Sequence, residues 1–144
     1  MDSDDHATAR ASEFETALRR AGIRITKQRA AILRALASAD DHPDAPALLE
    51  RAREGAPGLS LATVYRTLSE LQAQGVVLKL AFEGEPARFE PADQSHHDHM
   101  IDVDTGEVIE FTDERIERLQ AEIAAAHGYD IVRHRLDLYV KKRD

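Results

Sequence analysis

Apolar side chains recur at three- and four-residue spacing through the first half of the chain, which is the pattern of amphipathic helices. Capping residues and glycine breakers divide this half into four predicted helices. They cover residues 12–21, a segment that begins after Thr26, residues 44–54 and residues 61–74. The polar residues 1–12 precede this pattern, and we expect them to form a mobile tail.

The helix predicted over residues 61–74 has two distinct faces. Its inward face is expected to consist of the apolar residues at helical spacing, namely Leu61, Val64, Leu68 and Leu71. Its outward face is then polar and consists of Thr63, Tyr65, Arg66 and Ser69. A polar face with arginine, threonine and tyrosine can contact base edges and phosphates, although ordinary surface residues are the alternative explanation.

After Gly75 the pattern changes to that of strands. Residues 76–82 and 87–90 flank a glycine- and proline-containing turn, and together they predict a β-hairpin. Short helices followed by a hairpin are the order of a winged helix-turn-helix, in which the last helix before the wing enters the major groove of DNA.

The remaining residues predict a second, smaller unit. Two short strands flank a turn at 104–106, a helix covers residues 113–127, and alternating residues from Val132 to Val140 indicate a final strand. We therefore expect an α+β protein, with a winged-helix domain at 13–90, a hinge at 91–95 and a small αβ domain at 96–144. Because about 50 residues bury little core alone, this second domain is expected to dimerise.

Charge is distributed unevenly between these parts. The net charge is −8, yet residues 19–39 contain six basic residues and no acidic one. Residues 92–144 contain 7 basic and 13 acidic residues. Because salt screens charges more than about 10 Å apart, a local basic patch can bind phosphate within an acidic protein. A solvated helix face is the alternative for the patch alone.

Composition excludes several classes of protein. The chain has no cysteine, so disulfides, thiolate nucleophiles and cysteine-based zinc sites are impossible. It also has no apolar run of the roughly 20 residues that span a membrane, and no secretory signal pattern. We expect a cytoplasmic protein that has no small-molecule substrate.

The most chemically informative segment is His96-His97-Asp98-His99. Imidazole and carboxylate are ligands for divalent iron, manganese, zinc and cobalt. In an extended strand successive side chains point to opposite faces, so His96 and Asp98 would face one way and His97 and His99 the other. The segment therefore predicts two metal sites per chain rather than one, with a polar loop as the alternative.

Each pair needs further ligands from elsewhere in the chain. The candidates are His42, Glu90, Glu107, Glu110, Glu117, His127 and His134. The sequence leaves their roles open, because His134 lies on the apolar face of its predicted strand and could be a core residue. His42 lies in a predicted loop and could be an ordinary loop histidine.

Several stretches together resemble the ferric uptake regulator family, over residues 14–141. They are Ala21-Gly22-Ile23-Arg24-Ile25-Thr26, Leu61-Ala62-Thr63-Val64-Tyr65-Arg66, Phe82-Glu83-Gly84, His96-His97-Asp98-His99 and Glu107-Val108-Ile109-Glu110-Phe111. The resemblance implies a homodimeric, metal-dependent repressor that binds palindromic DNA operators. It implies no enzymatic activity and no catalytic residues. A metal hydrolase is the alternative from another class, but the sequence has no hydrolase motif such as HExxH.

The resemblance also assigns roles to residues. It implies a regulatory metal site formed by His42, Glu90, His97 and His99. It implies a second site formed by His96, Asp98, Glu117 and His134. It further implies that Tyr65 and Arg66 read the major groove and that Arg24 reaches the minor groove, and we expect Thr63 and Arg29 to contribute to the same DNA-binding surface.

One departure from the family pattern affects the choice of metal. Many members hold a structural zinc ion with two CxxC pairs, whereas here Asp102 and Thr105 occupy the positions of the first pair. The zinc-sensing branch usually keeps those cysteines, and the peroxide-sensing branch typically has aspartate at the position of Glu90. Fe(II) is therefore the expected metal, with a manganese-responsive regulator as the alternative and Zn(II) or Co(II) as possible occupants.

Overall fold

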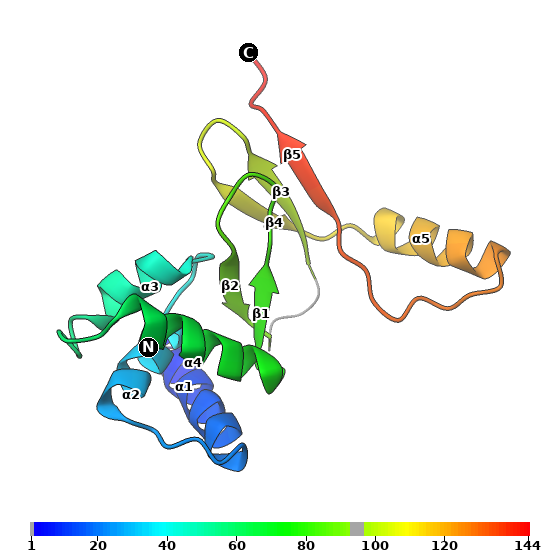
Figure 1. Cartoon of the computed structure of the whole chain (residues 1–144). Helices are drawn as coiled ribbons and strands as arrows, with labels where there is room; N and C mark the ends of the chain where they lie inside the picture. Colours follow the sequence, from blue (N-terminus) through cyan, green and yellow to red (C-terminus); the bar gives the residue numbers. More distant parts are fainter. Residues whose placement is uncertain (1, 93–96) are drawn as a thin grey trace. The chain divides into compact units, whose positions relative to one another are not determined.

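The computed structural model describes residues 2–92 and 97–144. The chain divides into two compact units, Met1–Gln94 and Ser95–Asp144, which are described separately here. Unit 1 contains the helices α1 (Asp2–Arg20), α2 (Lys27–Ala37), α3 (Ala45–Ala52) and α4 (Leu61–Ala73), followed by the strands β1 (Val77–Leu80) and β2 (Arg88–Pro91) (Figure 1). Unit 2 contains β3 (Asp98–Asp102), β4 (Val108–Phe111), α5 (Glu114–Ala126) and β5 (Asp137–Val140).

The helices of unit 1 begin where local chemistry predicts. The side chains of Thr26, Asp44 and Ser60 accept hydrogen bonds from the backbone N–H groups three residues further on, at the starts of α2, α3 and α4. Each bond satisfies a donor that the helix itself leaves unpaired. The predicted caps of these three helices are therefore confirmed.

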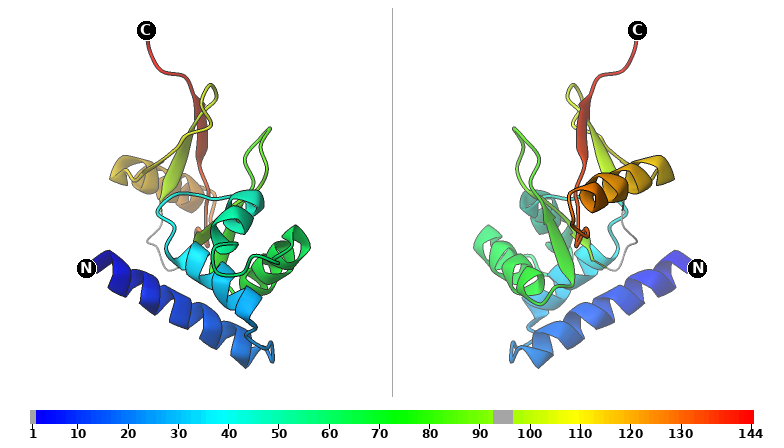
Figure 2. Two further views of the ribbon diagram at one scale, coloured as in Figure 1. Left: turned by 90° about the vertical axis from the view of Figure 1, so that its left-hand side faces the viewer. Right: turned by 90° about the vertical axis from the view of Figure 1, so that its right-hand side faces the viewer.

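The start of α1 differs from the prediction of a tail over residues 1–12. The helix begins at Asp2, and its N-terminal half projects beyond the other helices of unit 1 (Figure 2). This stretch contains three alanines and no proline or glycine, so nothing in it interrupts a helix. Ser12, predicted as the cap, instead lies inside the helix, where its carbonyl accepts a bond from Thr16 Oγ1 at 2.9 Å.

The core of unit 1 is formed by apolar residues that the helical spacing predicts. The buried side chains include Phe14, Leu18, Ile32, Leu36, Leu48, Val64, Leu68, Leu71 and Phe89. The prediction for Leu61 is wrong, because this side chain is 37% exposed. Leu59, in the loop before the helix, is buried instead, and Thr67 completes the inward face of α4 by donating its hydroxyl to the Thr63 carbonyl.

A glycine at the end of α4 directs the chain into the wing. Gly75 has a φ of +77°, and the next residue, Val76, donates its N–H to the carbonyl of Leu71 at 3.3 Å. This is the arrangement in which a left-handed residue ends a helix, and a side chain at that φ would be strained. The antiparallel strands β1 and β2 then form the predicted hairpin, with Leu78 opposite Glu90.

Unit 2 is a three-stranded sheet in the order β4-β3-β5. β3 is antiparallel to β4 and parallel to β5. The last strand is shorter than predicted. Only residues 137–140 pair with β3, so His134 lies before the strand in an irregular segment. The alternation of apolar residues from Val132 onward is real, but residues 132–136 are not part of the strand.

A carboxylate organises the turn between β3 and β4. Asp102 Oδ1 accepts hydrogen bonds from the backbone N–H groups of Asp104 at 2.8 Å and Thr105 at 3.3 Å. These bonds hold the pKa of the Asp102 carboxyl below its usual range. Gly106 closes the turn at a φ of +77°, and its N–H donates to the Asp102 carbonyl at 2.7 Å.

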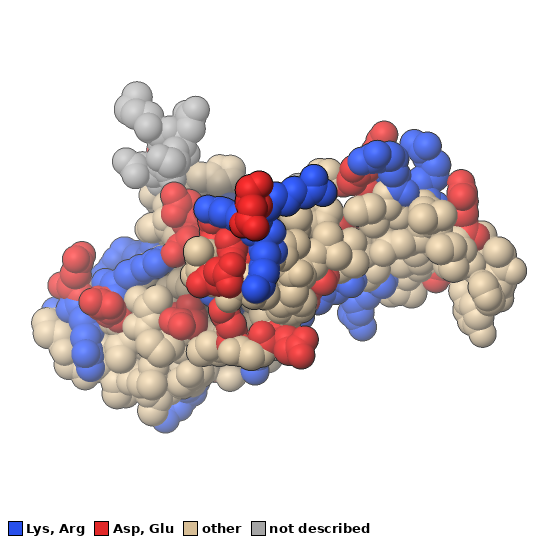
Figure 3. Space-filling view, turned by 90° about the horizontal axis from the view of Figure 1, so that it is seen from above, with Lys and Arg blue, Asp and Glu red and all other residues tan. Residues whose placement is uncertain are grey.

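Unit 2 has very little core of its own. Among its described residues, Ile101 is the one buried apolar side chain, and α5 has no buried residue. Leu119 and Ile123 on α5 are 56% and 52% exposed, and Val132 is 91% exposed. Over α5, on the right of Figure 3, charged side chains lie along the edges and uncharged surface lies between them. No helix in the described part of the chain has the length and apolar character needed to cross a membrane.

The cap of α5 leads to a prediction about pH. Asp113 accepts from the Arg115 N–H at 2.9 Å and pairs with the Arg115 guanidinium, chiefly through a side-chain hydrogen bond that lowers its pKa to about 2. Because the folded-state pKa is depressed, this stabilisation is present above the ordinary value of 3.8 and is lost as the pH falls toward 2. We expect Asp113→Ala to lower the melting temperature by a few degrees at neutral pH.

The difference between the parent and Asp113→Ala should stay nearly constant from neutral pH to about 5, and shrink as the pH falls through 3.8 toward 2. Circular dichroism melting curves at several pH values measure it, and comparing the two proteins at each pH removes the contribution of other carboxylates. A difference that stays constant as the pH approaches 2 would show that the charged form of Asp113 does not stabilise α5.

Candidate metal centres and nucleic-acid surface

One pair of candidate metal ligands lies in unit 1, where a loop and the wing bring a histidine and a glutamate together. Phe89 of β2 donates its N–H to the carbonyl of Pro43 at 2.9 Å, and Asp44 forms an antiparallel bridge with Arg88. Because the bridge is antiparallel, the residue two positions before Asp44 is opposite the residue two positions after Arg88. His42 is therefore opposite Glu90. Their side chains are 3.1 Å apart between Nε2 and Oε2, and they are 7% and 3% exposed.

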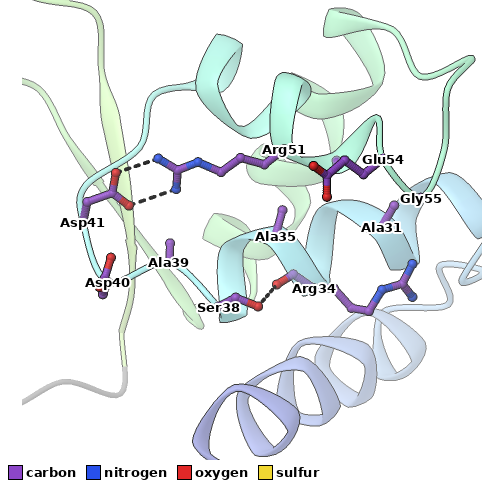
Figure 4. Close-up of a pocket in the computed structure, with 11 residues that line it drawn as sticks. Ala31, Arg34, Ala35, Ser38, Ala39, Asp40, Asp41, Arg51, Glu54 and Gly55 are labelled. Carbon is purple, nitrogen blue, oxygen red and sulfur yellow. Dashed lines mark hydrogen bonds and ion pairs between the residues drawn. The ribbon is translucent and has the colours of Figure 1, made fainter. Parts of the chain in front are cut away.

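A second contact of unit 1 holds the His42 loop from the other side. Arg51 of α3 donates two hydrogen bonds to Asp41, at 2.9 and 2.6 Å, across a shallow hollow of about 390 Å³ between α2 and α3 (Figure 4). The guanidinium of Arg51 lowers the pKa of Asp41 below its usual range, so this carboxylate stays charged. The loop residue next to His42 is therefore tied to a helix, which limits the positions that the imidazole can take.

Unit 2 has a pair of imidazoles of its own. His97 and His99 lie two residues apart at the start of β3, and their rings meet edge to face with centroids 4.8 Å apart. His99 is opposite Glu110 in the register of β3 and β4, and the Glu110 Oε1 lies 3.5 Å from the His97 Nε2. Glu110 was named from the sequence only as one of several available carboxylates, and strand register is what places it beside these histidines.

The opposite face of β3 carries a different cluster. Asp98 is fully buried and its Oδ1 lies 3.5 Å from the Nε2 of His134, which in turn lies 3.4 Å from the Oε1 of Glu117. One ligand atom from each of these three residues lies within 4.8 Å of the other two. A buried carboxylate beside an imidazole and a second carboxylate suits a borderline divalent cation, which would balance their charge.

The sequence prediction for this second cluster is partly outside the described structure. His96, its expected fourth member, lies in the undescribed segment 93–96. Two further candidates from the sequence, His127 and Glu107, are not members of either cluster. His127 ends α5 and places its Nδ1 2.9 Å from the carbonyl of Ile123, and Glu107 is an exposed residue after the β3–β4 turn.

The polar face of α4 is open to solvent. Tyr65 is 47% exposed, Arg66 and Ser69 are exposed, and Thr63 is partly exposed. Arg24, in the loop before α2, is also exposed. These side chains are therefore available to a nucleic acid, as a recognition helix and an adjacent arm require.

Arg29 is placed differently from the other basic residues in the predicted DNA-binding set. Its guanidinium donates to Glu70 of α4 at 3.2 Å and to the Arg24 carbonyl at 3.1 Å. The Arg29 and Glu70 side chains are 19% and 18% exposed. The guanidinium therefore links the α2 region to α4, and the contribution of Arg29 to the DNA-binding surface stays a prediction.

A winged helix followed by a unit with histidine–carboxylate clusters defines the class of metal-responsive transcriptional regulators. A model of the ferric uptake regulator family matches residues 20–139. Over 130 residues the chain is 51% identical to the ferric uptake regulation protein of Brucella abortus, covering 90% of this chain and 92% of that protein. The chain belongs to the ferric uptake regulator family, and it is a transcription regulator rather than an enzyme.

Solved structures agree with this assignment. The ferric uptake regulator from Pseudomonas aeruginosa with manganese is 44% identical and superimposes with a TM-score of 0.76, covering 90% of this chain and 98% of that one. A zinc-bound manganese uptake regulator is 39% identical with a TM-score of 0.74 and the same coverage. The α+β fold and the absence of enzymatic function are thereby confirmed, and the metal-hydrolase alternative is excluded.

Proposed function

We propose that this protein is an Fe(II)-dependent repressor of iron-homeostasis genes that acts in the cytoplasm as a homodimer on palindromic operators. The observation that carries the proposal is the pair of buried His42 and Glu90 in unit 1, together with the paired His97 and His99 in unit 2. The ligands of the proposed centre are thus divided between the two units. A metal that bound all of them would control the hinge between the units.

A divalent cation fits these residues chemically. The carboxylate of Glu90 and the neutral imidazoles of the three histidines are suitable ligands, and Glu110 is placed to supply a further carboxylate. Burying His42 and Glu90 at 7% and 3% exposure removes them from water, and a cation between them would offset that cost. We infer that His42, Glu90, His97 and His99 form the regulatory centre, and that Asp98, Glu117 and His134, with His96, form a second one.

The mechanism follows from where the ligands are attached. When bound, the metal supplies a positive charge that ligands from both units share. His42 and Glu90 then fix the orientation of the wing and α4 relative to the unit that carries His97 and His99. In a dimer, this orientation sets the spacing of the two α4 helices, which has to match the helical repeat of DNA half-sites.

The dimer itself is supported by the surface of unit 2. A unit of about 50 residues with one buried apolar side chain among those described cannot be stable through its own core. The large exposed apolar residues of α5, β5 and the segment between them are Leu119, Ile123, Tyr129, Ile131, Val132, Leu138 and Tyr139. We propose that a second copy of the chain covers them.

The proposal is tested by titrating the parent protein with metal under anaerobic conditions. DNA binding is followed by fluorescence anisotropy, with a palindromic duplex obtained by in-vitro selection with the metal-loaded parent protein. We expect Fe(II) to raise the affinity by roughly 5- to 150-fold over the chelator-treated protein, which is the usual range of coupling between two sites. Equal affinity with and without metal would contradict a metal-dependent repressor.

Manganese is the second candidate for the physiological metal, because the chain is also 39% identical to a zinc-bound manganese uptake regulator. Imidazole and carboxylate ligands do not discriminate strongly between Fe(II) and Mn(II). The same titration with buffered Mn(II), Zn(II) and Co(II) ranks the metals by the free concentration at which each activates. Activation by Mn(II) at concentrations where cells hold it, but by Fe(II) only above them, would favour the manganese-responsive function.

A further inference from the structure

Asp137 lies beside a proposed metal ligand, although neither the sequence patterns nor the proposed function gives it a role. It is the first residue of β5 and is opposite His99 in the parallel register of β3 and β5. Residues opposite each other in neighbouring strands project from the same face of a sheet. The Asp137 Oδ1 accordingly lies 3.7 Å from the Nδ1 of His99, and the two side chains are 17% and 4% exposed.

The two oxygens of Asp137 have different surroundings. Oδ2 is 2.8 Å from the Nη2 of Arg135, whose side chain is 40% exposed. Oδ1 is buried and accepts no hydrogen bond within the described residues. A buried acceptor that lacks a donor is costly, so a donor brought within reach of Oδ1 would be stabilised.

His99 can provide that donor in one of its two neutral forms. An imidazole that binds a metal through one nitrogen carries its proton on the other, and this proton is usually donated to a carboxylate or a carbonyl. With the proton on Nδ1, His99 would face Asp137 through that nitrogen and present Nε2 to the metal. A small approach of the two side chains converts the 3.7 Å separation into a hydrogen bond.

We propose that Asp137 is a positioning residue for the regulatory centre, which holds the proton of His99 on Nδ1 and so directs Nε2 to the metal. This inference rests on the proposed function, because it requires His99 to be a ligand. Asp137 is not itself a ligand in this arrangement, because its carboxylate is close to Nδ1 of His99, whereas Nε2 is the nitrogen that would bind the metal.

A backbone hydrogen bond also joins the two strands at this position. The N–H of His99 donates to the carbonyl of Leu136 at 3.1 Å, immediately before Asp137. The backbone of the ligand and the backbone of its positioning residue are thus joined directly. The pairing of the strands fixes which residues are opposite each other. The contact between the Asp137 and His99 side chains then sets the position of the proton and the orientation of the ring.

The test uses the full chain and Zn(II) as a diamagnetic probe. Long-range ¹⁵N–¹H spectra of the histidine side chains report which nitrogen carries the proton and which binds metal. Competition with a chromophoric chelator measures the affinity of each centre. In the parent protein we expect Zn(II) on Nε2 of His99 and the proton on Nδ1. We expect Asp137→Val and Asp137→Asn to weaken Zn(II) binding at this centre by roughly 10- to 100-fold, as for other residues that orient metal ligands.

Two comparisons isolate the effect. The centre of Asp98, Glu117 and His134 should keep its affinity in the same variants, and Asp130→Asn makes the same chemical change at an exposed position of unit 2. If Asp137→Val fails to fold, as judged by circular dichroism, the isosteric Asp137→Asn decides the question. Undiminished affinity in the folded variants, or Zn(II) on Nδ1 of His99, would overturn the inference.

The outcome also separates this inference from the proposed function. If Zn(II) leaves the His99 nitrogens of the parent protein unperturbed, the regulatory centre itself is wrong, and the role of Asp137 falls with it. If the parent binds Zn(II) through His99 and the Asp137 variants bind it equally well, only the positioning role is wrong.

Discussion

His97→Ala should make DNA binding independent of metal. In the proposed regulatory centre this substitution removes one imidazole and leaves Glu110 without the ring that lies 3.5 Å away. Without this imidazole, unit 2 would offer one ligand fewer to the proposed centre, and metal binding would no longer be coupled to the orientation that DNA requires. We expect the metal-induced gain in affinity, roughly 5- to 150-fold for the parent, to fall to about one. Anisotropy titrations with and without Fe(II) measure this ratio directly.

The control for this experiment is another histidine that lies away from both clusters. His6 is exposed on α1, so His6→Ala should retain the full response to metal. Melting curves without metal should be similar for the parent and both variants, because no core residue is changed. Metal activation that survives in His97→Ala would show that the regulatory centre does not depend on this residue.

Arg66→Ala should lower the affinity for the selected operator even when metal is saturating. Arg66 is exposed on α4 and is not needed for the core, so the loss is expected in DNA binding and not in stability. An arginine that makes paired hydrogen bonds to a guanine contributes about 1–3 kcal/mol to discrimination, which corresponds to roughly 5- to 150-fold in affinity. Gln72→Ala, also exposed on α4 but in its last turn, is the matched control and should bind normally.

The salt dependence shows which kind of contact Arg66 makes. If it reads a base, its loss should reduce the preference for the selected operator over a scrambled duplex. If it contacts phosphate, binding to both duplexes should weaken equally and the slope of log affinity against log salt should fall by about one. Unchanged affinity for both duplexes would remove Arg66 from the DNA-binding surface.

Local chemistry made much of unit 1 predictable from the sequence. Thr26, Asp44 and Ser60 cap their helices through bonds to residues only three positions away, so their role can be seen in a short stretch of sequence. The alternation of β3 likewise separates Asp98 from His99, and the structure places them in clusters on opposite faces of the strand. These features depend on helix and strand periodicity, which the sequence displays.

The features that the sequence did not reveal depend on pairing between distant segments. The ion pair between Arg29 and Glu70 could not be seen in the sequence, because the two residues are 41 positions apart. The roles of Glu110 and Asp137 depend on the residue of β3 that each is opposite. The register between two strands cannot be deduced from the sequence of either strand alone. His134 is similar: its alternating neighbours predicted a strand, but only residues from Asp137 onward find a partner in β3.

The turn that Asp102 organises is held by a carboxylate, which makes it insensitive to oxidants. By family resemblance, Asp102 and Thr105 stand at positions where many members hold zinc through cysteine thiolates. Here a carboxylate fixes the same turn with backbone hydrogen bonds at 2.8 and 3.3 Å. Because a carboxylate is inert to peroxide and disulfide exchange, oxidants that convert thiolates to sulfenic acids leave this turn unchanged.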